Sequence, residues 1–341
     1  MPELEYPFKN IPGPGEAMEI TPGVKWVRMP MNMALDHINL YLLRDHDGWI
    51  VVDTGLRSRA TQAHWETVFE NELEGLPVKA VLVTHLHPDH IGQADWLCER
   101  WNAPLLMTRT EYLTARLLKS ESGGNHSEEY IRFYQRAGLQ GEALESLKNS
   151  TKGLGKLFGD LPRSYQRLQD GQVLSFEGRD WQIIVGRGHA NEHACLYCQE
   201  LNMLVAGDQV LPRITPNVSV HSDEPEANPV EEWLASQKKL MALPPVVLTL
   251  PAHNEPFLGL TERLQFIIDH HEEQLALLQK LCRTPKSAVE LLPAMFGREL
   301  YAANLMFGIG ECVAHLNCLS ERSLLKRHEN ENGVILYEGL T

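Results

Sequence analysis

The 341-residue sequence lacks the features that mark several classes of protein. No stretch approaches about eighteen uninterrupted apolar residues, the length of a membrane-spanning helix, so we expect no membrane partner. The first twenty residues show neither the apolar core of a secretory signal nor an Arg-rich presequence, which predicts a cytoplasmic protein. There is no internal repeat and no low-complexity tract. The expectation is therefore an ordinary folded protein of the cytoplasm.

Positive charge is also scarce. Lys and Arg total 31 against 45 Asp and Glu, which gives a formal net charge of −14. Such a chain repels nucleic-acid phosphates and anionic membranes at long range. This net charge does not exclude a local basic patch. Apolar residues make up 43% and charged residues 22%, as in soluble globular proteins. We therefore expect a small-molecule substrate rather than nucleic acid.

Cysteine is limited to six scattered residues. A chain of this length can bury a sizeable core and needs no disulfide framework. Cys195 and Cys198 are three residues apart in a segment with a strand-like pattern. Side chains three apart on a strand point to opposite faces, so a redox or zinc pair is not expected. We interpret both as ordinary strand thiols.

Apolar runs of strand length alternate with segments of helical periodicity over most of the chain. The runs at 39–44 and 49–55 flank Asp47 and Gly48, a strong hairpin signal. We expect further strands at about 78–85, 103–107, 172–178, 181–187, 194–198, 202–208 and 246–250, with helices at about 58–73, 91–101, 230–242 and 260–282. This alternation predicts a layered α/β fold.

Two segments depart from this alternation. Residues 110–168 show two or three helical patterns, which we interpret as an insertion that covers a site or forms an oligomer surface. Residues 283–341 show helices and then a hairpin at Asn332-Gly333, the outline of a small winged-helix-like domain. The predicted domains are thus 1–282, catalytic, and 283–341.

The chemistry is concentrated directly after the strand-like run at 78–85. His85, His87, Asp89 and His90 place four candidate metal ligands within six residues. Such clustering carries a desolvation cost unless something binds it. A turn after the strand could direct the first two at one metal ion and the last two at a neighbouring one.

This H-x-H-x-D-H pattern resembles the signature of the metallo-β-lactamase superfamily. The superfamily's other elements follow strand-like runs in the expected order: Asp53-Thr54-Gly55, Gly188-His189, Gly207-Asp208 and Pro251-Ala252-His253, with Ala252 in place of the usual glycine. The resemblance covers most of residues 20–260 and implies an αββα sandwich. The C-terminal segment, less specifically, resembles the group with a C-terminal winged helix, the β-lactamase-like protein two type.

The resemblance also implies a role for each residue. His85, His87 and His189 would bind one metal ion, while Asp89, His90 and His253 would bind a second. Asp208 would bridge the two, Asp53 would orient a ligand histidine, and Asp89 would steer a proton as the catalytic residue. Nitrogen and oxygen donors suit zinc, which we expect, but also Mn or Fe. Two such ions about 3.5–4 Å apart would lower the pKa of a shared water to about 7.

The leading hypothesis is a metal-dependent hydrolase of an ester-like bond, thioesters first, then lactones or phosphoesters. A single-strand endoribonuclease and a non-enzymatic ligand sensor are the alternatives. β-Lactam hydrolysis ranks low because a fold alone does not assign an activity. The C-terminal helix at 310–322 offers one Arg and two Glu, a poor surface for phosphates. We expect that domain to shape the substrate pocket or to form a homodimer.

Several other polar residues have plainer interpretations. His37 is expected to be a surface or hydrogen-bonded histidine, and Arg213 fits an anionic substrate group and a structural ion pair equally. His270 and His271 are assigned to the solvated face of a helix. His193 is expected to pack at a strand end, and His315 inside the small domain.

Overall fold

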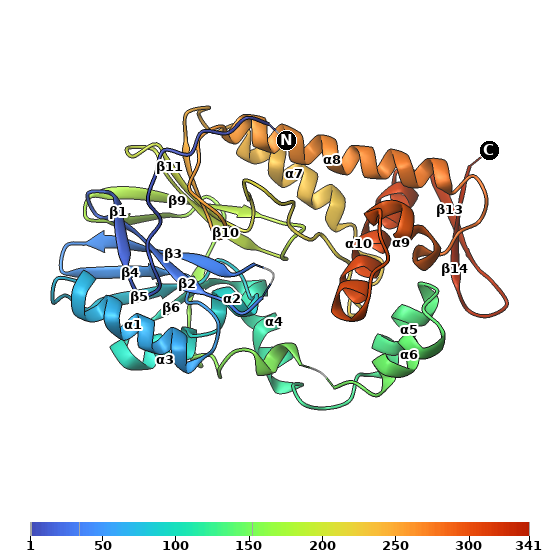
Figure 1. Cartoon of the computed structure of the whole chain (residues 1–341), viewed down its shortest axis with the longest axis horizontal. Coiled ribbons are helices and arrows are strands. Elements are labelled where there is room, and N and C mark those ends of the chain that lie inside the picture. Colours follow the sequence, from blue (N-terminus) through green and yellow to red (C-terminus); the bar gives the residue numbers. More distant parts are fainter. Residues whose placement is uncertain (1, 34, 152, 341) are drawn as a thin grey trace.

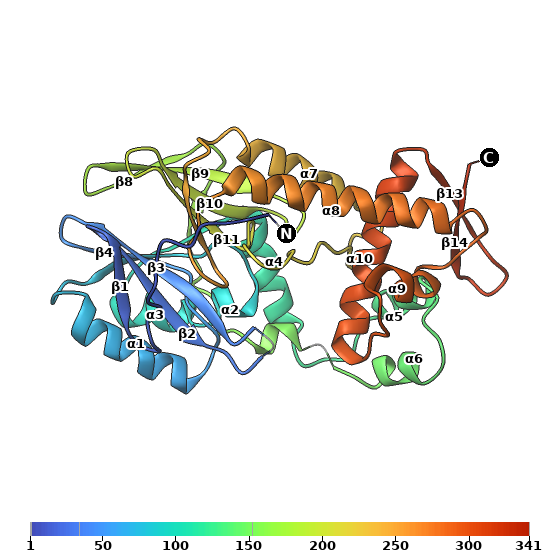
Figure 2. The ribbon, with the colours of Figure 1, turned by 45° about the horizontal axis from the view of Figure 1, so that its top comes forward.

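Two β-sheets lie face to face, with helices on their outer faces (Figures 1 and 2). The computed structural model describes residues 2–33, 35–151 and 153–340. The first sheet has the order β1-β2-β3-β4-β5-β6-β7 and the second the order β12-β11-β10-β9-β8. The first consists of β1 (Ala17–Thr21), β2 (Val24–Pro30), β3 (His37–Asp45), β4 (Gly48–Val52), β5 (Val78–Leu82), β6 (Leu105–Thr108) and β7 (Gln166–Leu168). The second consists of β8 (Val173–Phe176), β9 (Arg179–Gly186), β10 (His193–Cys198), β11 (Met203–Gly207) and β12 (Leu248–Pro251).

The hairpin predicted at Asp47-Gly48 is confirmed. Strands β3 and β4 pair antiparallel, and Asp45 lies opposite Gly48. After this hairpin the sheet continues with parallel pairs, β4 with β5, β5 with β6 and β6 with β7. Parallel neighbours need crossover connections. The helices α1 (Arg59–Glu72), α2 (Pro88–Ile91), α3 (Ala94–Trp101) and α4 (Arg109–Ser120) lie in these connections.

Three hydrophobic layers hold the sandwich together. Between the sheets pack Trp26, Tyr41, Leu196 and Val205, together with their apolar neighbours. A second cluster lies between the first sheet and the helices α1 and α3, around Trp65. Helices α7 (Pro229–Leu240) and α8 (Leu260–Leu281) cover the second sheet (Figure 2). The predicted αββα sandwich is therefore confirmed, and Cys195 and Cys198 both lie on strand β10 as expected.

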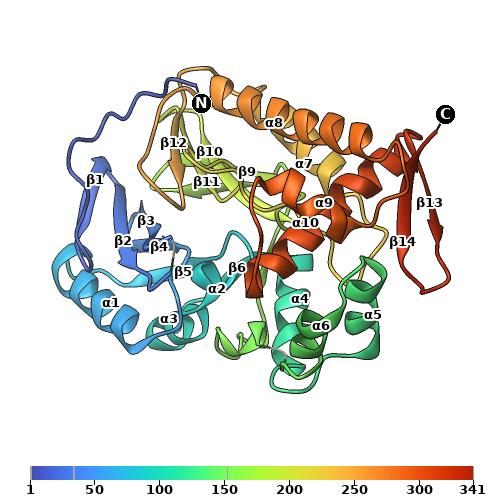
Figure 3. The ribbon, with the colours of Figure 1, turned by 45° about the vertical axis from the view of Figure 1, so that its right-hand side comes forward.

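The helical insertion folds back along the molecule toward the C-terminal segment. Beyond α4 it contains α5 (Glu128–Arg136), α6 (Gly141–Lys148) and the short 3-10 helix η1 (Leu154–Lys156). The amide of Val289 donates to the Ala137 carbonyl at 3.0 Å. Phe133 and Tyr134 join the same hydrophobic cluster as Leu291. Helices α5 and α6 thus pack against the end of the same chain (Figure 3).

The C-terminal segment contains two helices and the predicted hairpin. They are α9 (Ala288–Phe296), α10 (Ala302–Glu321), β13 (Leu325–Glu329) and β14 (Ile335–Gly339). Gly333 supplies the positive φ of 76° in the turn between the strands. One hydrophobic cluster runs without interruption from α7 and α8 into α9 and α10. The winged-helix assignment and the boundary after residue 282 stay predictions.

The prediction that His271 lies on the solvated face of a helix is wrong. Its side chain is fully buried, and its Nδ1 lies 3.0 Å from Nε2 of His315. Helix α10 covers this face of α8, a long-range contact that helical periodicity could not reveal. His315 is also fully buried, as expected, but it lies at the contact of α10 with α8 and not wholly inside the C-terminal segment. Among the described residues, no helix is both long enough and apolar enough to cross a membrane.

The packing between the sheets predicts the effect of two matched substitutions. Val205, 1% exposed on β11, loses two buried methyl groups in Val205→Ala, which we expect to lower the free energy of unfolding by about 2 kcal/mol. Val173 on β8 of the same sheet is 53% exposed, so Val173→Ala should change it by less than about 0.5 kcal/mol. Urea unfolding measures both. Equal effects would contradict this description of the core.

Candidate metal centre

The candidate ligands lie at one edge of the sandwich, Asp89 and His90 on the short helix α2 and the others in loops. His85 and its neighbours follow β5, Asp208 follows β11 and His253 follows β12. His189 lies in the turn between β9 and β10, and Asp53 directly follows β4. Because β4 and β5 are parallel, as are β11 and β12, these strands end at the same edge. Segments up to two hundred residues apart thereby converge.

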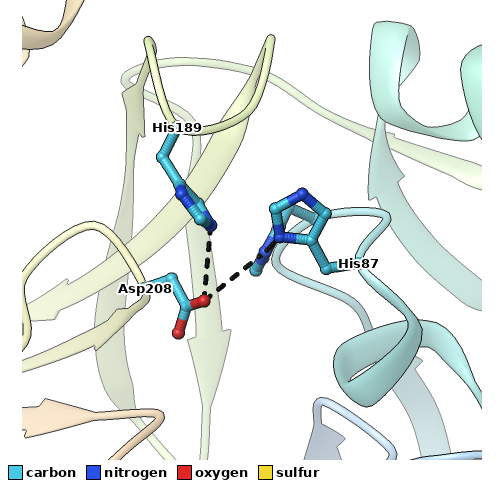
Figure 4. Close-up of side chains that lie close together, drawn as sticks. His87, His189 and Asp208 are labelled. Atoms are coloured by element: carbon cyan, nitrogen blue, oxygen red, sulfur yellow. Dashed lines mark hydrogen bonds and ion pairs between the residues drawn. The ribbon is translucent and has the colours of Figure 1, made fainter. Parts of the chain in front are cut away.

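The seven residues form two groups whose donor atoms lie within 4.8 Å of one another in each group. The first group is His85, His87, His189 and Asp208, and the second is Asp89, His90 and His253. Figure 4 shows His87, His189 and Asp208 turned toward one another from separate segments. The histidines and Asp89 fall into the two sets that the sequence analysis expects, and Asp208 falls into the first group.

Asp208 lies between the two groups and faces both. Its Oδ2 is 3.3 Å from Nε2 of His189, in the first group. Its Oδ1 is 3.5 Å from Nε2 of His90 and 3.5 Å from Nε2 of His253, in the second group. One carboxylate oxygen is thus directed to each group, which is the arrangement that a bridging ligand needs.

The residues present fit a pair of cations. Nε2 of His90, Nε2 of His189 and Oδ1 of Asp208 are buried and have no hydrogen-bond partner in the part of the chain that the structure describes. A buried polar atom left unpaired costs about 1–3 kcal/mol, so three in one place call for a ligand. Imidazole and carboxylate donors are those that zinc and related divalent ions prefer. A divalent cation at each group would satisfy these atoms.

Hydrogen bonds to the other ring nitrogens orient three of the histidines. Nδ1 of His90 donates to the Asp53 carboxylate at 2.8 Å. Nδ1 of His189 and of His253 donate to the carbonyl oxygens of Asn217 and His37, each at 2.8 Å. These acceptors fix the tautomer and leave each Nε2 free to face the centre.

Asp53 is itself held rigidly. Its backbone has a φ of 62°, in the left-handed region, directly after β4. Its two carboxylate oxygens accept from the Thr84 amide at 2.8 Å and from the Thr84 hydroxyl at 2.9 Å. The side chain therefore stands where the sequence analysis places it, beside a candidate ligand histidine.

Burial and mutual repulsion set the charges of the first group. Burial, and then the neighbouring His90, hold the pKa of His85 well below its usual range. Burial and the neighbouring His189 lower the pKa of His87 to about 3. Both imidazoles are therefore neutral at pH 7, the form that binds a metal ion.

The second group has the opposite balance. Burial disfavours the charged forms of His90 and His253, but nearby carboxylates outweigh it and raise both pKa values. Burial likewise opposes ionisation of Asp208, yet His90 and His253 hold its pKa well below the usual range. Without metal, the protons on these histidines balance the buried carboxylates, and a metal ion must displace them.

Glu111 is a residue of the site that the sequence analysis missed. It lies on α4, in the insertion, and is completely buried. Its carboxylate accepts from the amide of Leu86 at 2.9 Å and from the amide of Glu192 at 3.0 Å. It thereby joins the loop of His85 and His87 to the loop of His189. The signal available in the sequence was a glutamate on the apolar face of a helix, four residues before Ala115.

The plainer candidates lie outside the ligand groups. His193 is buried as expected at a strand start, and its Nε2 accepts from the amide of Asp208 at 3.1 Å. His37 is buried and hydrogen-bonded to Asp36, and its Nε2 accepts from the Asn254 amide at 2.8 Å. Arg213 forms an ion pair with Glu255 at 3.0 Å, the structural one of its two interpretations.

Comparison with known proteins assigns the family. Residues 34–253, more than half of the chain, match the family model described as the metallo-beta-lactamase superfamily. The chain belongs to this superfamily. Residues 275–340 match a second model, described as the metallo-beta-lactamase-like C-terminal domain. The protein is accordingly a metal-dependent hydrolase of the metallo-β-lactamase fold.

Relatives of this metallo-β-lactamase-fold hydrolase include solved and curated proteins. A beta-lactamase domain protein from Burkholderia ambifaria is 40% identical, with a TM-score of 0.92 and coverage of 99% of this chain and 98% of its own. A lactamase-like protein of Aspergillus niger is 26% identical over 78% of this chain and 66% of its own length. An atrochrysone carboxyl ACP thioesterase of Aspergillus fumigatus is 28% identical over 40% and 44%. The chain thus spans just under two thirds and under half of these two fungal proteins.

The two bonds of Glu111 predict a defined effect of Glu111→Gln. The amide side chain can accept only one of the two backbone N–H groups and presents an N–H to the other. We expect a loss of about 1–3 kcal/mol in unfolding free energy and a metal affinity lowered about tenfold. Glu66→Gln, which removes an exposed pair with Arg100, is the matched control and should change neither quantity appreciably. An unaltered metal affinity in Glu111→Gln would refute the positioning role.

The raised pKa values of His90 and His253 predict proton release on metal binding. Zinc added to metal-free protein at pH 7 should displace protons from these histidines, and two equivalents should bind per chain. The number released should fall as the pH rises through the raised pKa values, and affinity should weaken as the pH falls. Indicator dye in weak buffer measures the protons, and elemental analysis the metal. The exposed His46 provides a control, since His46→Ala should leave both unchanged.

Proposed function

We propose that this protein hydrolyses an ester-like bond in a small organic substrate, with thioesters as the preferred class. The observation that carries the proposal is the convergence of seven imidazole and carboxylate groups into two sets joined by Asp208. In this proposal His85, His87 and His189 hold one zinc ion, Asp89, His90 and His253 hold the other, and Asp208 bridges them. When bound, such ions supply an activated water at neutral pH and polarise the attacked carbonyl.

Asp89 is the residue best placed to move a proton. Its side chain is 18% exposed, against 9% for Asp208, so it reaches the solvent side of the site. Burial opposes its ionisation, but His90 and His253 outweigh this and lower its pKa. An ionised carboxylate within reach of solvent can accept a proton from the attacking water and pass it to the leaving group.

A thioester is favoured over other ester-like bonds for two reasons. Its thiolate leaving group needs little assistance, and all the carboxyl and imidazole groups of the two sets, Asp89 included, have a role as candidate ligands. The Aspergillus fumigatus relative, a thioesterase, supports the same class. Lactones and phosphoesters come next, because departure of their oxygen leaving group depends more on protonation.

The surface of the C-terminal hairpin gives no support to the nuclease alternative. Its two neighbouring cations are both neutralised within the chain: Lys326 lies 2.9 Å from Glu338, and Arg327 pairs with Glu226. With a formal net charge of −14, the protein offers phosphates little attraction. The small-molecule hydrolase is therefore the function we propose.

A substrate panel tests this proposal. Zinc-loaded protein is assayed with an acyl-CoA, an acyl-glutathione, a lactone, a phosphodiester, a β-lactam and unstructured RNA. We expect the thioesters to be turned over fastest, and Asp208→Ala or Asp89→Ala to lower the rate at least about a hundredfold. The surface variant Glu66→Gln should retain full activity. Metal-dependent cleavage of RNA but not of thioesters would overturn the substrate class, and no turnover at all would overturn the proposal.

A further inference from the structure

We infer that the C-terminal segment is part of the metal centre: Glu311 on helix α10, acting through Asn217, positions the candidate ligand His189. The inference rests on the proposed function to the extent that His189 holds a metal ion. It assigns Glu311 and Asn217 as positioning residues and not as ligands.

The orientation of His189 depends on a single carbonyl group. His189 follows Gly188, whose φ of 101° only glycine adopts readily, so the turn is sharply bent there. Nδ1 of His189 donates to the carbonyl oxygen of Asn217 at 2.8 Å. Its Nε2 has no hydrogen-bond partner and lies 3.3 Å from Asp208. Displacement of the Asn217 carbonyl would therefore turn the ring away from the centre.

The Asn217 carbonyl belongs to neither a helix nor a strand, so other contacts must hold it. Its own side-chain amide donates to Oε2 of Glu311 at 2.8 Å. The hydroxyl of Ser219 lies 2.6 Å from Oδ1 of the same side chain. The amide of Val220 donates to the carbonyl of Gly310 at 3.1 Å. The segment 217–220 is thus fixed to α10 at two successive residues, Gly310 and Glu311.

The approach of this segment to α10 is close enough to require glycine. A Cβ at Gly310 would lie 2.8 Å from the carbonyl oxygen of Val220 and 3.1 Å from Cβ of Ser219. Val218 and Val220 are almost fully buried and share a hydrophobic cluster with Ile309 of α10. The contact is therefore packed as well as hydrogen-bonded.

Glu311 is an unusual residue for a purely structural position. Among the described residues, its carboxylate forms no ion pair, and it accepts a hydrogen bond from the Asn217 amide. Burial raises its pKa to about 7. Keeping a carboxyl group at this position costs hydration free energy. The hydrogen bond to Asn217 explains why the group is there, because it holds the carbonyl that orients His189.

Metal affinity, rather than turnover, tests the inference. Asn217→Ala, Glu311→Ala and the double variant are titrated with zinc against a chromophoric chelator, and Co²⁺ absorption spectra report the ligand geometry. We expect each single variant to bind one of the two ions about tenfold more weakly. The double variant should bind metal no more weakly than the weaker of the two single variants, because all three variants remove the same hydrogen bond between Asn217 and Glu311. Glu311→Gln, which keeps an oxygen acceptor, should restore affinity to within about twofold.

Glu321 provides a matched control on the same helix. Its carboxylate also accepts from an asparagine amide, that of Asn228, but among the described residues Asn228 forms no hydrogen bond with a candidate ligand. Glu321→Ala should therefore leave metal affinity and the Co²⁺ spectrum unchanged.

The inference is overturned if folded Glu311→Ala binds both ions as tightly as Glu321→Ala does. If Glu311→Ala does not fold, Asn217→Ala, which keeps the backbone carbonyl, decides by the same comparison. Because the readout is metal binding, a failure of the thioesterase proposal would leave this result intact.

Discussion

The structure depends on the cost of removing seven imidazole and carboxylate groups from water. Four of them are buried and the other three are half-buried, and three of their atoms have no hydrogen-bond partner among the described residues. The surroundings offset this cost in two ways: Asp53, Asn217 and His37 accept from the outer ring nitrogens, and the carboxylates balance the protons on His90 and His253. The arrangement of these groups therefore suits the binding of cations.

Sequence patterns were sufficient wherever one segment alone determines the structure. The β3–β4 hairpin follows from Asp47-Gly48 between two apolar runs, and the cluster at His85 to His90 is visible as four polar groups after a buried strand. The grouping of Asp208 and His253 with that cluster came from a family resemblance, and the parallel strand pairs explain it physically.

The sequence was insufficient where two distant segments decide together. Glu111 is an ordinary helix residue until the loops of Leu86 and Glu192 close around it. His271 has the spacing of a solvated position, but α10 covers it. The role that we infer for Glu311 depends on its hydrogen bond with Asn217, 94 residues earlier. No local periodicity carries these contacts, because each depends on the docking of elements that the chain connects only through the rest of the fold.

The packing of α5 and α6 against α9 has a consequence for how the protein is made. Phe133 and Leu144 of the insertion share their hydrophobic cluster with Leu291 and Leu316, which the ribosome synthesises about 150 residues later. Domains generally fold as units during translation, yet α5 and α6 of this insertion lack their apolar partners on α9 and α10 until those helices emerge. The apolar side chains of α5 and α6 therefore stay open to chaperones and proteases until α9 and α10 have been synthesised.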